Sequence, residues 1–395
     1  MFTIRTMNAI SPIIGEILAG YVVSTDAESP DALIVRSAEL KDYKRGAGLA
    51  AIARAGAGVN NIPVEACSAE GIVVFNTPGA NANAVAELVV AAMLMTGRDI
   101  LGGAEWVRTL KGRGGEVSKL VEKEKSRFTG PELRGKSLGV IGLGAIGALV
   151  ANAAIALGME VYGFDPYVSV EHAWALSRSV KRVTDREELV RSSDFITIHI
   201  PLTKDTRGLF NANMYAKMKE GATLLNFARG ELADCEDTIE ALRLGRLRAY
   251  ATDFPCDEML GVPGILALPH LGASTPESEE NCAKMAAEQL RDFLEYGVIR
   301  NSVNLPDVEL PRSKANRVTI VHRNTPGMLG AITGVLSADQ VNIANLTNTS
   351  RGELAYTALD IDGAFTSAQV AKLGGLEHVL RVRVIAAHPR LREGD

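Results

Sequence analysis

The stretch Gly142-Leu143-Gly144-Ala145-Ile146-Gly147 decides the fold of this chain. It has the spacing G-x-G-x-x-G and lies between an apolar run at 137–141 and a helix-like run at 148–157. In a strand–turn–helix unit, the first glycine forms the tight turn, the second lets the backbone approach a pyrophosphate, and the third lets helix and strand pack closely. The helix N-terminus then offers unpaired N–H groups to phosphate oxygens. The stretch therefore predicts a dinucleotide site, with Gly142, Gly144 and Gly147 against the cofactor.

Asp165 indicates which dinucleotide is bound. It follows a second short apolar run at 159–164, and lies about 20 residues beyond the glycines, where an acidic residue meets the ribose. A carboxylate accepts hydrogen bonds from ribose hydroxyls but repels a 2′-phosphate, and the next residues, Pro166 and Tyr167, supply no positive charge. The sequence therefore predicts NAD rather than NADP.

Length and composition bound the class of protein. The 395 residues suffice for two or three domains, and 47% of them are hydrophobic, which allows sizeable cores. A net charge of −5 argues against nucleic acid or an anionic membrane as a partner. The start of the chain, Met1–Arg5, lacks the layout of a signal peptide. The apolar stretch at 138–159 divides into strand, turn and helix, so no membrane span is expected.

The cysteines carry a separate expectation. There are four, without a C-x-x-C pair or a histidine at metal-ligand spacing: Cys67, Cys235, Cys256 and Cys282. Scattered cysteines of this kind are typical of a reducing cytoplasm. We therefore expect a cytoplasmic protein with neither a disulfide framework nor a metal site.

The order of apolar runs predicts an α/β architecture in which one domain is inserted into another. Strands are expected at 2–5, 33–36, 50–53 and 72–75, and then at 138–142, 160–164, 180–183, 195–200, 223–227, 249–253 and 265–268. Helices are expected at 82–96 and 276–296, and a charge-dense loop at 108–127. The second set of strands predicts a doubly wound parallel sheet. The expected domains are a discontinuous substrate-binding domain, 1–96 with 276–305, and a cofactor domain at 97–275.

The C-terminal part has a pattern of its own. After a linker at 306–315, residues 316–388 are expected to form a small separate domain. Strands are predicted at 317–322, 343–349, 355–361 and 379–385, and helices at 328–338 and 367–374. This β-α-β-β-α-β order is that of a ferredoxin-like fold.

Three side chains follow strands of the expected parallel sheet. Arg229, Glu258 and His270 each lie at or beyond a strand end. Each alone could be a surface or structural residue, but the carboxyl ends of parallel strands meet at one ligand crevice. Hydride transfer at a carbinol carbon needs a group that moves the hydroxyl proton, and a cation that holds a substrate carboxylate. We therefore expect His270 as acid and base, Glu258 as its orienting partner, and Arg229 as the carboxylate clamp.

Several motifs resemble the D-2-hydroxyacid dehydrogenase family over nearly the whole chain. They are residues 53–59 (ARAGAGV), 76–78 (NTP), 86–88 (AEL), the glycine stretch, 227–230 (FARG) and 269–275 (PHLGAST). The resemblance implies a flavodoxin-like substrate domain and a catalytic set of Arg229, Glu258 and His270. It implies NAD contacts from Thr77, Ala145, Ile146, Asp165, Phe227, Ala228, Arg229, Asp253, His270, Leu271, Gly272 and Ala273. It implies substrate contacts from Arg36, Arg54 and Asn81 in addition to Arg229.

The chain departs from the family pattern in places. Asn60-Asn61 replaces the usual Asp-Asn pair, and Met259 follows Glu258 where relatives have proline. The stretch from Glu258 to His270 is also short, which leaves Asp257 as a competitor for the role of Glu258. On the family pattern we expect the glycine stretch to face the Arg229, Glu258 and His270 loops across one cleft.

The C-terminal segment resembles an ACT domain, a small-ligand regulatory module. His322, Asn324 and Asn342 match the positions that bind L-serine in inhibited relatives, although a purely structural dimerisation domain is the alternative. The resemblance also implies a homo-oligomer, a dimer or tetramer. The implied reaction is NAD-dependent oxidation of a 2-hydroxy acid, with 3-phosphoglycerate as the first candidate. The alternatives are hydroxypyruvate, glyoxylate or 2-hydroxyglutarate as substrate, or an NAD-sensing, corepressor-like interaction protein.

Overall fold

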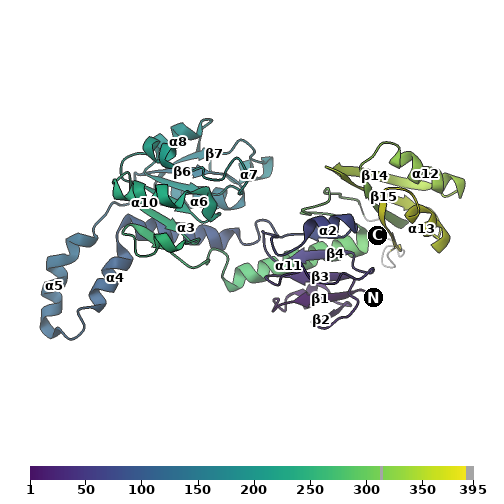
Figure 1. Ribbon diagram of the computed structural model, residues 1–395, viewed down its shortest axis with the longest axis horizontal. Helices are drawn as coiled ribbons and strands as arrows, with labels where there is room; N and C mark the ends of the chain where they lie inside the picture. The colour runs from purple at the N-terminus through teal and green to yellow at the C-terminus, as the bar shows by residue number, and fades with distance from the viewer. Residues whose placement is uncertain (312–314, 388–395) are drawn as a thin grey trace. The chain divides into compact units, whose positions relative to one another are not determined.

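The computed structural model describes residues 1–311 and 315–387, drawn in Figure 1. The chain forms two compact units: an inserted unit, Ala82–Ser278, and a flanking unit made of Met1–Asn81 and the chain from Glu279 onward. The insertion expected from the sequence is therefore present, but its boundaries differ from 96/97 and 275/276. The reason is helix α3 (Ala82–Gly97), which buries Val85 and Val89 in the same core as Val150 of the inserted unit. Residues 312–314 of the expected linker, and residue 388, lie outside the described residues.

The flanking unit begins with a parallel sheet in the order β2-β1-β3-β4-β5. This is the flavodoxin-like order, as predicted. Helix α11, with the predicted bounds, packs on it, and the rings of Phe75 and Phe293 meet edge to face at 5.7 Å. The edge strand β2 was not predicted, because only two of its residues, Val22 and Val23, are apolar. The elements are β1 (Thr3–Met7), α1 (Ile14–Ile17), β2 (Val22–Ser24), β3 (Ala32–Val35), β4 (Ala51–Arg54), α2 (Val64–Ala69), β5 (Val73–Phe75) and α11 (Pro276–Tyr296).

The C-terminal part of the flanking unit is a four-stranded antiparallel sheet in the order β14-β15-β13-β16, covered by two helices. The predicted β-α-β-β-α-β order is confirmed. Arg317 and Asp360 form a buried ion pair at 2.7 Å in this sheet. The Arg317 guanidinium also donates a hydrogen bond to the carbonyl oxygen of Tyr296 at the end of α11. The elements are β13 (Asn316–Arg323), α12 (Met328–Ala338), β14 (Ile343–Arg351), β15 (Leu354–Ile361), α13 (Ser367–Gly374) and β16 (Val379–Ile385).

The inserted unit is a doubly wound sheet of seven parallel strands in the order β12-β11-β10-β9-β6-β7-β8. This is the predicted Rossmann-type order, extended by one strand. The chain reverses direction across the sheet between β6 and β9, where such folds bind ligands. The strands are β6 (Ser137–Ile141), β7 (Glu160–Phe164), β8 (Lys181–Arg182), β9 (Phe195–Ile198), β10 (Ala222–Asn226), β11 (Leu247–Thr252) and β12 (Ile265–Ala267). The helices around them are α3, α6 (Ala145–Ala156), α7 (Val170–Ala175), α8 (Arg186–Ser192), α9 (Ala212–Lys217) and α10 (Cys235–Arg243), with short turns η3 (Gly230–Leu232) and η4 (Asp257–Met259).

The charge-dense segment at 108–127 is mostly helical, so the expectation of a loop is wrong. It forms an arm of the inserted unit (Figure 1) with α4 (Ile100–Arg108), η1 (Gly114–Glu116), α5 (Val117–Glu124) and η2 (Lys125–Phe128). Val117, Leu120 and Val121 recur at helical spacing and are half-buried, and Trp106 stacks near Phe128 with centroids 5.5 Å apart. Three apolar residues among many charges gave too weak a period to predict a helix. Among the described residues, no helix is both long and apolar enough to cross a membrane.

Candidate active-site residues

The glycine stretch forms the turn from β6 into α6. Gly142 has φ +92°, and a Cβ there would lie 2.5 Å from the carbonyl oxygen of His199, so only glycine fits. A Cβ on Gly144, by contrast, would meet nothing within 4 Å. Gly144 caps α6 without a side-chain hydrogen bond, so the first N–H groups of this 12-residue helix have no side-chain acceptor there. Open space before a bare helix N-terminus fits the pyrophosphate of a dinucleotide.

Asp165, at the end of β7, is held in place by the backbone. Its Oδ2 accepts a hydrogen bond from the N–H of Leu143 in the glycine stretch, and its Oδ1 accepts one from Tyr167, both at 2.8 Å. Each carboxylate oxygen has a second lone pair, which a ribose hydroxyl can use. The contact with Leu143 therefore ties the Asp165 carboxylate to the glycine turn.

Two other predicted cofactor contacts carry buried polar atoms without a hydrogen-bond partner among the described residues. Asp253, directly after β11, accepts a hydrogen bond from the N–H of Gly272 at 3.0 Å through Oδ2, whereas its buried Oδ1 has none. Burial raises the pKa of this carboxyl. In the flanking unit, Thr77 is fully buried and its Oγ1 also lacks a partner. Buried polar atoms are rarely left unpaired, so both positions fit a bound ligand that supplies hydrogen bonds.

Arg229 lies in the loop after β10, and a residue that the sequence analysis missed positions it. Asn226 is fully buried and donates from Nδ2 to the carbonyl oxygen of Arg229 at 2.9 Å and to the hydroxyl of Tyr250 at 3.2 Å. The guanidinium is exposed and donates to the carbonyl of Ala228. Throughout the described part of the chain it forms no ion pair with an acidic group. The sequence signal for Asn226 is a polar residue that ends a strand in which three of the four preceding residues are apolar.

His270 follows β12 and is exposed. Its ring lies 4.7 Å from the ring of Phe254, centroid to centroid, and its carbonyl oxygen accepts a hydrogen bond from Ser274. Phe254 follows β11, the neighbour of β12, so two adjacent strand ends bring these rings together. Within residues 1–311 and 315–387 the imidazole nitrogens of His270 have no hydrogen-bond partner, which leaves them available to a substrate.

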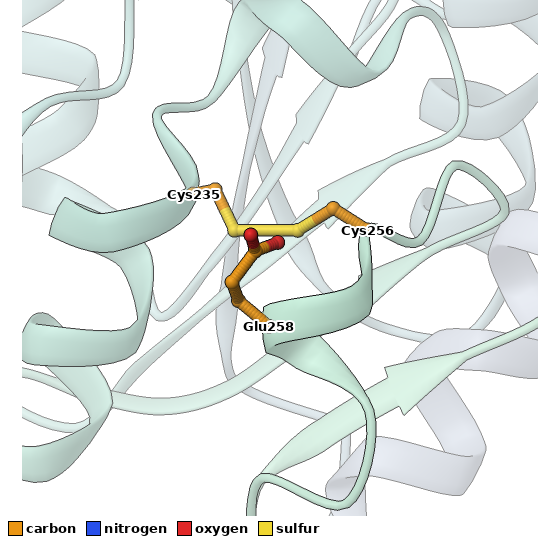
Figure 2. Close-up of side chains that lie close together, drawn as sticks. All are labelled: Cys235, Cys256 and Glu258. Carbon is orange, nitrogen blue, oxygen red and sulfur yellow. A yellow bond between two sulfur atoms is a disulfide. The ribbon is translucent and has the colours of Figure 1, made fainter.

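Glu258 is also exposed, in the η4 turn, and has neither a hydrogen bond nor an ion pair to any described residue, His270 included. Its carboxylate instead points at the sulfur atoms of Cys235 and Cys256, as Figure 2 shows. Cys235 and Cys256 are joined as a disulfide, so the expectation that no disulfide forms is wrong for this pair.

A second residue missed by the sequence analysis is His199, which follows β9. Its Nε2 contacts the hydroxyl of Thr197 at 2.9 Å, and its buried Nδ1 has no partner. Burial lowers the pKa of this histidine to about 3, so it is neutral at physiological pH. A histidine beside the glycine turn thus stays uncharged and is only a weak base.

The predicted substrate residues lie in the flanking unit. Arg36, directly after β3, forms an exposed ion pair with Glu279 at 2.6 Å. Arg54, the last residue of β4, donates from Nε to the carbonyl of Arg36 at 3.1 Å. Asn81 is half-buried and ends this part of the unit. Arg36 and Arg54 are therefore brought together, and the cleft expected between the two units stays a prediction.

The three predicted regulatory residues differ in access. His322 is buried, with Nδ1 at 2.8 Å from the carbonyl of Arg323 and Nε2 at 2.9 Å from the hydroxyl of Thr357. Asn324 donates to the carbonyl oxygen of Gly352 at 3.2 Å, and Asn342 donates to Asp362 at 2.6 Å. Asn342 also lines a shallow hollow of about 580 Å³ between α12 and the start of β14. Of the three residues, Asn342 is the one that lines this hollow.

Comparison with known proteins agrees with this geometry. Residues 90–272 match the family model of the D-isomer specific 2-hydroxyacid dehydrogenase, NAD binding domain. A D-3-phosphoglycerate dehydrogenase of Methanocaldococcus jannaschii is 38% identical over 84% of this chain and 62% of its own length. One of Haemophilus influenzae is 32% identical over 83% of this chain and 79% of its own length.

Solved structures give the same result. A structure of cofactor (NAD+) bound 3-phosphoglycerate dehydrogenase from Entamoeba histolytica is 30% identical, with a TM-score of 0.60, over 77% of this chain and 98% of that one. The chain spans only 62% and 52% of the first two curated relatives that it matches. The match to the Haemophilus influenzae protein, by contrast, extends over most of both chains. The chain therefore belongs to the D-isomer-specific 2-hydroxyacid dehydrogenase family.

Proposed function

We propose that this chain catalyses the NAD-dependent oxidation of 3-phospho-D-glycerate to 3-phosphohydroxypyruvate, the entry step of serine synthesis. One observation carries the proposal. Arg229, which forms no ion pair with a described residue, and His270, whose ring has no hydrogen-bond partner among them, are both exposed at the carboxyl edge of the sheet that holds the glycine stretch. The choice of substrate among 2-hydroxy acids is supported by the relatives, of which several are D-3-phosphoglycerate dehydrogenases.

The chemistry follows from these two side chains. The Arg229 guanidinium offers a planar pair of donors to the substrate carboxylate and polarises the reacting oxygen beside it. His270 takes the hydroxyl proton during oxidation and returns it in the reverse direction. NAD, when bound, supplies the nicotinamide ring that accepts the hydride. Glu258 supports the imidazolium of His270 once its carboxylate reaches a ring nitrogen.

The residues of the cofactor site suit NAD. Asp165 would hold the ribose hydroxyls, and the N–H groups at the start of α6 would hold the pyrophosphate. The unpaired Oδ1 of Asp253 would accept a hydrogen bond from the cofactor.

Arg36 and Arg54 would meet the phosphate or carboxylate of the substrate, since they are neighbours on adjacent strands. A ligand can displace Glu279 from Arg36, because an exposed ion pair contributes only about 0–1 kcal/mol. We also propose that the C-terminal sheet binds serine. The chain would form a homo-oligomer and work in the cytoplasm.

A spectroscopic assay tests it. NADH formation is followed with 3-phosphoglycerate, 2-hydroxyglutarate, glycerate and lactate, each with NAD and with NADP. We expect 3-phosphoglycerate with NAD to give the highest kcat/KM. Equal rates with acids that lack the phosphate would assign the chain to another 2-hydroxy acid, and no turnover of any acid would contradict the proposal.

A further inference from the structure

Cys235, Cys256 and Glu258 form a cluster that the proposed reaction does not use. Cys235 is the first residue of α10, and Cys256 caps the η4 turn that contains Glu258. Each of the three offers a sulfur or carboxylate oxygen atom that lies within 4.8 Å of the other two. Figure 2 shows the carboxylate directed at the bond between the two sulfur atoms.

The fold explains why cysteines 21 residues apart meet. Strands β10 and β11 are parallel neighbours, so the loops that follow them leave the same edge of the sheet. The first loop leads into α10 at Cys235, and the second leads to Cys256 and Glu258. The disulfide therefore ties the start of α10 to the η4 turn.

We propose that Cys235 and Cys256 are a reversible redox pair that controls the position of Glu258, and through it the support of His270. The control of turnover rests on the proposed function. In the bridged state described here, Glu258 lies beside the sulfurs and makes no hydrogen bond to His270. Reduction releases the η4 turn from α10 and lets the carboxylate reach the imidazole. Glu258 is thus a positioning residue, active in the dithiol state.

The exchange balances with a low-molecular-weight disulfide, RSSR, as the oxidant. One cysteine thiolate attacks RSSR, which forms a protein–SR mixed disulfide and releases one RS⁻. The second thiolate attacks the protein sulfur of that mixed disulfide, which closes the Cys235–Cys256 bond and releases the second RS⁻. The protein loses two electrons and two protons, and RSSR gains them as two RSH. A dithiol reductant reverses both steps.

The other two cysteines are poor candidates for the same chemistry. Cys67 and Cys282 are buried, at 0% and 5% exposed. Burial raises the pKa of the Cys67 thiol to about 11, which leaves little of the thiolate that exchange requires. Cys235 and Cys256 are partly exposed. Cys235 and Cys256 are therefore the reactive pair, and Cys67 and Cys282 serve as unreactive controls in the same chain.

The experiment uses the full chain, equilibrated with reduced dithiothreitol or with glutathione disulfide. Free thiols are alkylated, and mass spectrometry locates the bridge. Oxidation is expected to join Cys235 to Cys256 and to lower kcat about tenfold, with the KM for NAD unchanged and the pH profile of kcat shifted. The Cys235→Ser variant is expected to keep the kcat of the reduced enzyme in both conditions, and Cys282→Ala to respond like the wild type.

Hydrogen–deuterium exchange of the Asp257–Met259 turn reports its release without any turnover. Faster exchange after reduction supports the proposal, and unchanged exchange overturns it. The proposal also fails if both thiols stay free in glutathione disulfide, or if the bridge closes without changing kcat. Zinc retained by the reduced chain with both thiols protected would make the cluster a metal site instead. A chain whose turn responds but which oxidises no acid in either state contradicts the proposed function alone.

Discussion

In the five-stranded sheet of the flanking unit, the arginine that follows β3 already has an acidic partner, whereas in the seven-stranded sheet of the inserted unit the arginine after β10 has none among the described residues. Arg36 is paired with Glu279, whereas the Arg229 guanidinium donates to the backbone carbonyl of Ala228 and forms no ion pair with any described residue. Both arginines leave the carboxyl edge of a parallel sheet, where ligands bind. The difference shows that the position of a residue in the fold makes it a candidate for ligand binding. Its existing partners then determine how much of its charge is available to a ligand.

The largest expected effect tests whether the edge of the inserted unit carries the chemistry. His270→Ala should lower kcat with 3-phosphoglycerate by roughly 10²- to 10⁴-fold, because the hydroxyl proton loses its acceptor. NADH binding, measured by fluorescence titration, should be unchanged. His172→Ala, at a half-buried histidine of the same unit, is the matched control and should turn over normally. Near-wild-type kcat in the first variant would remove His270 from the mechanism.

The two arginines themselves give the intermediate effect. Arg229→Lys should lower kcat/KM about 100-fold, since a single ammonium cannot form the paired contact to a carboxylate. Arg36→Gln should raise the KM for the substrate less than about tenfold, because that guanidinium is already shared. Glu279→Gln should lower this KM slightly, since it frees Arg36.

Arg45, paired with Glu70 on the surface of the flanking unit, provides the control, and Arg45→Gln should change neither constant. Steady-state kinetics with all four variants measures the contrast. If Arg36→Gln cost more than Arg229→Lys, the comparison between the two sheet edges would be reversed.

The smallest effect concerns stability in acid. His199 has a folded pKa of about 3, below its ordinary 6.5. Between these values the unfolded chain binds a proton that the folded chain does not, so the stability of the inserted unit falls as pH falls from about 6.5 to about 3. Hydrogen exchange of the β6 and β9 amides should quicken between neutral pH and about pH 5 more than that of β3 and β4.

The His199→Gln variant keeps a donor for Thr197 but cannot titrate, and should reduce this pH dependence. An unchanged slope in the variant would assign the acid sensitivity to other groups.

Much of the fold could be predicted, and the failures have physical causes. Strand β7 and helices α11, α12 and α13 have the predicted bounds, because long apolar periods and Gly, Pro or Thr at their ends define them. The arm at 108–127 was expected to be a loop because few apolar residues mark it. The unit boundary differs from the predicted one because helix α3 is apolar enough for either unit, and only its packing on Val150 assigns it.

For the site, the residue types and their places after strands predicted Arg229 and His270 as catalytic residues. The structure places both on exposed loops at one edge of the sheet. Spacing could not reveal Asn226 or His199, because their importance lies in burial and in partners from other strands. The contact of Glu258 with two sulfur atoms was equally invisible, since it joins loops from two neighbouring strands.

The sequence by itself determined the alternation of strands and helices, the glycine turn with its acidic companion Asp165, and the β-α-β-β-α-β order of the C-terminal sheet. These features are local, and each is set by the period of apolar residues and by the backbone freedom of glycine. Only the tertiary structure decided which charged groups have partners and which cysteines meet. Such pairings depend on which strands are neighbours, and strand order is set by long-range packing that no local pattern records.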